Sequence, residues 1–148
     1  HTPELIRDFI TGTEAAAADV TLGITREETV LADLPEAAKA FHRVKDGGFS
    51  SCNLYALSGR KALETAEVFR GGGQFGKKHW RILKAFGLTP FILYKFKLVS
   101  IAEIARRIGK GFGLKIAPVF LSYAYGPIDV DDESSFRLSE KILKQREG

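Results

Sequence analysis

The stretch Pro127-Ile128-Asp129-Val130-Asp131-Asp132-Glu133-Ser134-Ser135-Phe136 separates an apolar segment, 114–121, from an amphipathic one, 133–146. The first is typical of a strand and the second of a helix. Asp129 and Asp131 stand two apart on extended backbone, so both carboxylates would point to the same side. Carboxylate oxygens suit Mg²⁺. Acidic residues at a helix start also complement its dipole and cap its N–H groups. The spacing alone leaves metal binding and helix capping both open.

Outward from this stretch, helical and strand patterns alternate along the chain. Asp46-Gly47-Gly48 marks a turn, 26–40 is charged and irregular with at most a turn of helix, and 90–98 is ambiguous between helix and strand. Strands separated by helices indicate an α/β protein with layered packing. The predicted helices are 3–17, 60–69, 77–86, 100–108 and 133–146, and the predicted strands are 18–24, 40–44, 49–57 and 114–121.

Composition limits the protein class. A length of 148 residues with 45% hydrophobic residues is enough for one domain with a real core. No apolar run reaches the ~18 residues that a membrane span needs. The single cysteine, Cys52, excludes an intramolecular disulfide and fits a reducing compartment. We therefore expect a cytoplasmic protein without a transmembrane segment.

Residues 71–78 imitate a phosphate-binding loop. Gly71, Gly76 and Lys77 match most of the pattern G-x-x-x-x-G-K-[ST], but residue 78 is Lys and lacks the hydroxyl that would hold Mg²⁺. The pattern also needs a strand before it, whereas 60–69 is predicted helical. A connector between helices is the favoured interpretation.

The segment 76–115 is strongly basic, with ten Lys and Arg residues and Glu103 as its single acid. Such a surface could bind phosphates, nucleic acid or an anionic membrane. A solvated basic face is the more ordinary interpretation, and no nucleic-acid partner is expected. The alternative function for the chain is a non-catalytic module that binds an anionic partner through this surface. Such binding would weaken steeply with salt and would not depend on Mg²⁺.

Two segments together resemble a known family. They are Phe41-His42-Arg43-Val44-Lys45-Asp46-Gly47-Gly48-Phe49-Ser50-Ser51-Cys52-Asn53-Leu54-Tyr55-Ala56-Leu57, and Ile128-Asp129-Val130-Asp131 with the helix that follows. Both are similar to segments of the nucleotidyltransferases with a MobA-like NTP transferase domain. Lys77-Lys78-His79-Trp80 is similar to a basic segment of one subgroup. Thr2-Pro3-Glu4-Leu5-Ile6 resembles the helix that follows the family's mid-chain metal-binding aspartate. The resemblance covers nearly the whole chain but only the C-terminal half of the family domain.

The resemblance implies a three-layer α/β/α, Rossmann-like nucleotidyltransferase fold, present here as its C-terminal portion over 1–148. It also implies a reaction in which an acceptor phosphate or hydroxyl attacks the α-phosphorus of an NTP with Mg²⁺ and releases pyrophosphate. Asn53 could instead satisfy backbone groups at a β-bulge. The implied site residues are Asp131 and then Asp129 as metal ligands, Asn53, Gly48 and Ser51 in the acceptor pocket, and Lys77 and Lys78 at substrate phosphates.

Several family features are absent from residues 1–148. The glycine-rich loop that cradles the triphosphate and the first metal-binding aspartate are both missing, and Ser51 and Ser135 replace a usual glycine and aspartate. We therefore expect little nucleotidyl transfer by the chain alone. We also expect an unpaired sheet edge, which would favour self-association or contact with a chain that supplies the missing strands.

Overall fold

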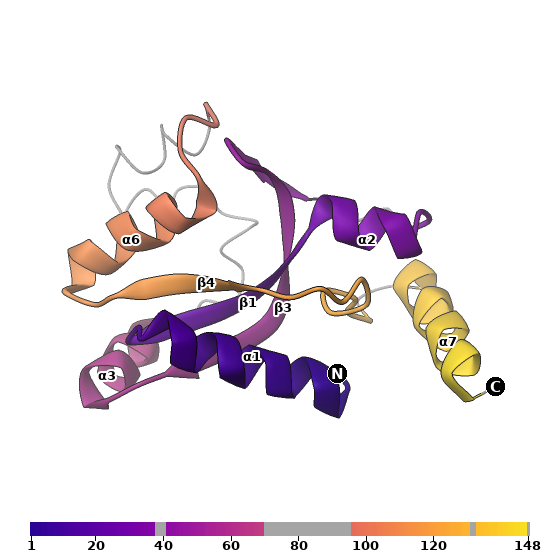
Figure 1. Cartoon of the computed structure of the whole chain (residues 1–148), viewed down its shortest axis with the longest axis horizontal. Coiled ribbons are helices and arrows are strands. Elements are labelled where there is room, and N and C mark those ends of the chain that lie inside the picture. The colour runs from indigo at the N-terminus through magenta and orange to yellow at the C-terminus, as the bar shows by residue number, and fades with distance from the viewer. Residues whose placement is uncertain (38–40, 70–95, 131–132, 148) are drawn as a thin grey trace.

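The computed structural model describes residues 1–37, 41–69, 96–130 and 133–147 (Figure 1). The predictions for 71–78, 77–86 and most of 90–98 concern residues outside these ranges. The described elements follow the order expected of an α/β protein. They are α1 (Pro3–Ala16), β1 (Val20–Arg26), α2 (Glu27–Asp33), β2 (His42–Val44), β3 (Gly47–Leu57), α3 (Arg60–Phe69), α6 (Ile101–Phe112), β4 (Ile116–Phe120) and α7 (Glu133–Glu147).

The described strands form a mixed four-stranded sheet in the order β2-β3-β1-β4. β1 is antiparallel to β3 and parallel to β4. The predicted strands 49–57 and 114–121 lie in this sheet as β3 and β4, with β1 between them. β2 pairs with the first residues of β3 at the edge of the sheet, as predicted for the 40–44 segment.

Helices cover both faces of this sheet. On one face Leu5 and Phe9 of α1 pack against Cys52, Val119 and Leu121. The opposite face is covered by α6, whose Ile101 and Ile104 pack with Ile24 and Val44. Figure 1 shows α1 and α6 on opposite sides of the strands. The predicted three-layer α/β/α architecture is therefore confirmed.

Covering both faces changes the expected pattern of β1. The alternation of Val20, Leu22 and Ile24 predicts one buried side, but Thr21 and Thr25 are also fully buried. A strand covered on both faces loses the alternation of buried and exposed residues. The Thr21 hydroxyl is satisfied by the Thr13 hydroxyl of α1, at 2.8 Å.

The ends of the helices follow from their capping residues. The Thr2 side chain accepts from the Leu5 N–H, and Pro3 is the first residue of α1. Ser100 caps α6 as predicted, but the predicted end at residue 108 is wrong because α6 runs to Phe112. Gly113, at φ 61°, ends it in the left-handed conformation that glycine tolerates.

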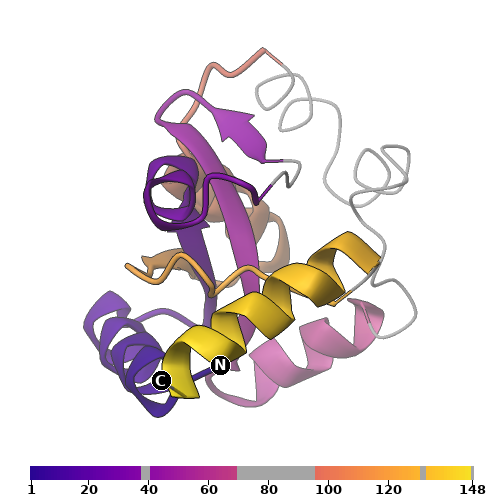
Figure 2. The ribbon, with the colours of Figure 1, turned by 90° about the vertical axis from the view of Figure 1, so that its right-hand side faces the viewer.

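α7 packs at one end of the molecule, against α2 and the segment that follows β4 (Figure 2). Its Leu138 and Ile142 contact a buried cluster that includes Val30 and Ala124. Lys141 also forms an ion pair with Glu36. α7 therefore packs against the loop that carries Asp129 and against α2, rather than against the sheet.

Part of β3 forms an edge of the sheet. β2 pairs only with Gly47–Phe49. Beyond that point, within the described ranges, β3 has β1 on one side and no strand on the other. Tyr55 on this stretch is 62% exposed. Unpaired edges of this kind favour pairing with another chain, and the expected self-association stays a prediction.

Candidate functional site

β3 bulges at Asn53. Leu22 pairs with Tyr55 and Ile24 pairs with Ser51, so the segment 52–54 stands opposite Gly23 alone. Asn53 has a φ of 53°, in the left-handed region that asparagine tolerates better than most residues. The bulge breaks the ladder and turns the Asn53 side chain outward, because bulges re-aim side chains. The bulge considered for this position is present, and the Asn53 side chain contacts the side chains of Ser51 and Asp129 there.

Ser51 stabilises this bulge from within the same strand. Its hydroxyl oxygen accepts from the Asn53 backbone N–H at 3.1 Å. The same hydroxyl donates to Asn53 Oδ1 at 3.5 Å. With its Oδ1 engaged by Ser51, Asn53 directs its amide nitrogen toward the loop after β4.

Asp129 receives that amide nitrogen. Asn53 Nδ2 donates to Asp129 Oδ2, which joins two residues separated by 76 positions in the sequence. Asn53 is exposed and Asp129 is half-buried. The structure thus brings together Asn53, Ser51 and Asp129, each of which the sequence singled out for a site.

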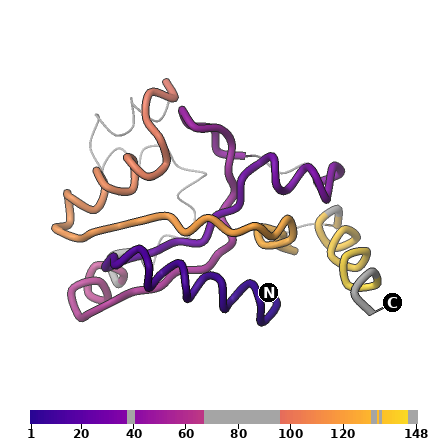
Figure 3. Tube along the Cα trace, in the orientation of Figure 1, coloured from indigo at the N-terminus to yellow at the C-terminus, as the bar shows by residue number. Residues whose placement is uncertain are grey.

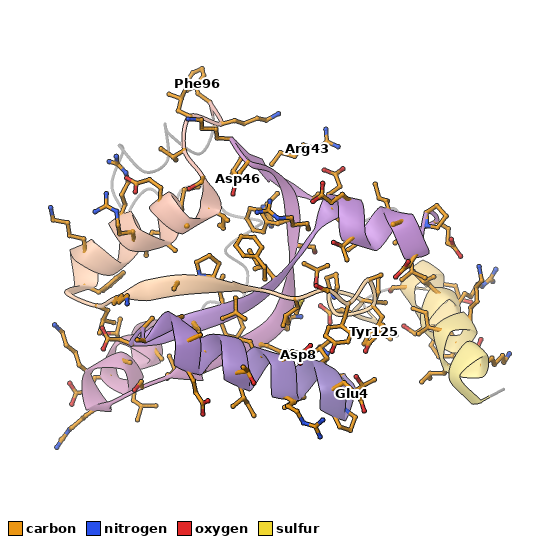
Figure 4. All side chains as sticks on the ribbon, in the orientation of Figure 1. Glu4, Asp8, Arg43, Asp46, Phe96 and Tyr125 are labelled. Atoms are coloured by element: carbon orange, nitrogen blue, oxygen red, sulfur yellow. The ribbon has the colours of Figure 1, made fainter. Side chains whose placement is uncertain are left out.

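Asp129 lies in the loop 121–130, which follows β4 in the Cα trace (Figure 3). Two tyrosines that the sequence analysis did not select hold this loop. Tyr123 donates its hydroxyl to Asp8 Oδ2 at 2.6 Å. The Tyr125 hydroxyl and Thr2 Oγ1 lie 2.9 Å apart. Figure 4 shows Tyr125 over the first turns of α1, on the side of Glu4 and Asp8. No local signal pairs these residues, because their partners are more than a hundred positions away.

The phenol of Tyr123 is electrostatically perturbed. Its hydrogen bond to Asp8 raises its pKa to about 12, with desolvation and the charges of Asp8 and Glu4 acting in the same direction. Nearby negative charge disfavours the phenolate form. Tyr123 therefore stays a hydrogen-bond donor over the whole physiological pH range.

Gly48 lies elsewhere in the structure. It stands in the β2–β3 hairpin, roughly 15 Å along β3 from Asn53 at ~3.3 Å per residue. A side chain at Gly48 would clash with Glu27, whose Cβ lies 2.9 Å from the position of an added Cβ. Glu27 in turn is paired with Arg43 at 2.7 Å. Figure 4 shows Arg43 and Asp46 at this separate corner.

A depression of about 290 Å³ opens at that corner. Its walls carry both signs of charge, and Arg26 bonds to the Asp46 carbonyl at 2.9 Å while its guanidinium carbon lies 4.4 Å from the Phe120 ring centre. The structure thus places Gly48 in a depression that Asn53, Ser51 and Asp129 do not line. The lining residues are Arg26, Glu27, Glu28, Asp46, Gly47 and Gly48.

Of the two predicted metal ligands, the structure describes Asp129. Among the described residues, no group of three or more His, Cys, Asp and Glu side chains has the geometry to hold a metal ion. Asp131, the first candidate ligand, lies outside the described residues, as do Lys77 and Lys78. Asp129 offers its second carboxylate oxygen, Oδ1, as a further acceptor.

The described part of the basic 76–115 surface is largely occupied by internal contacts. Arg106 and Arg107 both pair with Glu103, at 2.8 and 2.7 Å, and this pairing lowers the pKa of Glu103 to about 2. Lys115 donates to the carbonyl oxygens of Ala16 and Ala17 at the end of α1, both at 2.9 Å. These cations stabilise the fold, and nothing in their contacts favours an anionic partner.

Comparison with known proteins identifies the fold. No protein-family model matches the chain, and no curated protein does. A solved structure described as a hypothetical transferase from Thermus thermophilus is similar to 90% of the chain, with 24% identity and a TM-score of 0.75. The chain spans 57% of the length of that protein. The chain therefore shares the α/β fold of that structure. Among the described residues, no helix combines the length and apolar character needed to cross a membrane.

Proposed function

We propose that this chain belongs to a nucleotidyltransferase of the MobA-like kind, which transfers NMP from an NTP to a phosphorylated or hydroxyl acceptor with Mg²⁺ in the cytoplasm. The observation that carries the proposal is the contact between Asn53 and Asp129, two residues chosen from separate family-like segments. Their meeting is what one shared site requires.

The location of this contact supports the proposal. β1 and β4 run parallel, and Ile24 pairs with Phe120 near their carboxyl ends. The loop 121–130 leaves β4 at that end. In open α/β sheets, ligands bind in the crevice outside the carboxyl ends of the strands. The similarity to a structure described as a hypothetical transferase points the same way.

The donor chemistry fits Mg²⁺. This ion binds through one or two carboxylates, water and substrate phosphates, and does not need a closed cage of protein ligands. Asp129 and Asp131 would hold it, and the bound ion would neutralise charge on the phosphates. Asn53, with an amide donor and a carbonyl acceptor, would orient the acceptor, while Lys77 and Lys78 would contact phosphates.

The start of α1 is placed consistently with this assignment. By resemblance, the family's mid-chain aspartate precedes the helix that begins at Pro3. The hydrogen bond between Thr2 and Tyr125 places that helix start beside the loop that carries Asp129.

The test is pyrophosphate release from the four NTPs with Mg²⁺ and phosphorylated or hydroxyl acceptors. It is run on the full-length protein. Asp129→Asn and Asp131→Asn should each lower turnover by an amount on the order of a few kcal/mol in the barrier. Asp33→Asn, an exposed carboxylate of α2, is the matched control and should match the parent. Release that is unaffected by either substitution, or no release from any NTP, would overturn the proposal.

A further inference from the structure

Two tyrosine hydroxyls join the loop 121–130 to α1. Tyr123 bonds to Asp8 at 2.6 Å, and Tyr125 bonds to Thr2 at 2.9 Å. The two rings also lie against each other, with centres 5.5 Å apart and planes at 56°. We name this pair of side chains with their two α1 partners the tyrosine clasp.

The backbone of the same loop is held from the sheet. The Thr25 hydroxyl of β1 donates to the Tyr123 carbonyl oxygen at 3.3 Å, and the Gly126 N–H donates to the same oxygen at 3.0 Å. Thr25 is fully buried. The loop is therefore fixed on two sides, by its backbone to β1 and by its phenols to α1.

The clasp lies close to Asp129 along the chain. Ile128 N–H donates to the Tyr125 carbonyl oxygen at 3.1 Å, which closes a turn, and Pro127 inside that turn is fully buried. Asp129 is the residue that follows this turn. The backbone immediately before Asp129 is thus fixed by the turn that begins at Tyr125.

We propose that Tyr123 and Tyr125 are positioning residues that hold the Asp129 carboxylate against Asn53. Packing alone would keep the rings in the core, where both are partly buried beside the α1 cluster. The hydroxyls add direction, because a hydrogen bond weakens steeply when its donor angle departs from linear. The catalytic consequence of this positioning rests on the proposed function, but the positioning itself does not.

The test follows the side-chain amide protons of Asn53 by nuclear magnetic resonance in the whole chain. Their signal is assigned by its loss in Asn53→Gly, since glycine accepts the positive φ at that position. Asp129→Ala gives the reference position of the signal without its acceptor. The double variant Tyr123→Phe with Tyr125→Phe keeps both rings and removes both hydroxyls.

We expect the double variant to move the Asn53 signal most of the way to its position in Asp129→Ala. Tyr55→Phe is the matched control, because Tyr55 is a 62% exposed tyrosine of β3 outside the clasp. The Asn53 signal should stay in place in this variant. An unmoved signal in the double variant overturns the inference. If the double variant does not fold, Tyr125→Phe alone carries the same two outcomes.

A Mn²⁺ titration of the same sample separates the two proposals. Paramagnetic broadening around Asp129, lost in Asp129→Ala, supports the metal assignment. If no resonance near Asp129 broadens in the parent chain while the clasp variants shift Asn53, the metal assignment fails and the clasp stands. If Mn²⁺ broadens this region and the clasp variants leave Asn53 unmoved, the metal assignment stands and the clasp fails.

Discussion

Helix α6 and the loop 121–130 both carry several polar contacts, but the contacts differ in reach. In α6, Glu103 binds Arg106 and Arg107, three and four positions away, and Ser100 caps the N–H of Glu103 itself. In the loop, the partners of Tyr123, Tyr125 and Asp129 come from 76 to 123 positions away. One set forms within a single helix and the other only when the fold is complete.

The local and the long-range contacts have different consequences for the protein. Pairs within an exposed helix contribute modestly to stability and are screened by salt. The long-range contacts instead bring α1, β3 and the loop to one half-buried carboxylate. Among the described residues, Arg106 and Arg107 make their contacts within α6 and Lys115 at the end of α1, whereas the candidate site is built around the single carboxylate of the loop 121–130.

The largest effect should come from removing the core beneath each region. Leu5 of α1 is fully buried and packs with Tyr123 and Tyr125 of the loop, whereas Ile104 belongs to α6 and packs against the sheet. Leu5→Ala and Ile104→Ala should each lower the free energy of unfolding by about 2–5 kcal/mol, through lost burial and the cavity left. Denaturant titration measures this. The comparison predicts that only Leu5→Ala also moves the Asn53 amide signal, and a shift in both variants would contradict it.

Removing the two helix caps should cost different amounts of stability, because one cap also belongs to the tyrosine clasp. Ser100→Ala removes a cap from α6 and should cost about 1 kcal/mol of stability. Thr2→Ala removes a cap from α1 and also the partner of the Tyr125 hydroxyl, so its cost should be larger, about 1–2 kcal/mol. Thr2→Ser should restore most of the loss, because it keeps the hydroxyl. Equal costs for Thr2→Ala and Ser100→Ala would show that the Tyr125 contact adds nothing.

The Tyr123 phenol should report the clasp by its pKa. Its pKa is raised to about 12 in the folded protein, so the folded state holds this proton more tightly than the unfolded state does. The associated stability is fully present below the usual tyrosine pKa near 10 and is lost as pH rises through about 12. Asp8→Asn should lower the pKa of Tyr123 toward its ordinary value. Absorbance titration of the phenolates measures this shift, and Tyr123→Phe identifies the transition that belongs to Tyr123.

The smallest effect belongs to the α6 ion pairs. The pKa of Glu103 is lowered to about 2, first by its hydrogen bond to Arg106. The folded state therefore holds this proton less tightly, and the stabilisation is present above about pH 4.5 and is lost as pH falls through 2. Glu103→Gln should lower the melting temperature slightly at neutral pH, with the difference vanishing near pH 2 and shrinking in high salt. Glu64→Gln, in the more exposed pair with Arg60, should change it less.

Much of the fold could be predicted from local patterns. The start of α1 at Pro3 and the whole of α3 agree with the expected ranges, since caps and helical periodicity act over a few residues. The predicted end of α6 at residue 108 is wrong, because the helix continues through Gly109 to Phe112. In the structure Gly109 stays helical and lies against the returning chain, where an added Cβ would be 3.0 Å from Ile116 Cγ1.

The sequence by itself determined the candidate site residues and the fold class. Asn53, Ser51 and Asp129 were chosen from their residue types and their resemblance to family segments, and the layered α/β class followed from the alternation of helices and strands. Only the tertiary structure decided that these three meet, that Gly48 lies at another corner, and that Tyr123 and Tyr125 bind α1. The physical reason is that a hydrogen bond needs its two groups within about 3 Å. For residues so far apart in the sequence, strand pairing and helix packing alone decide that distance.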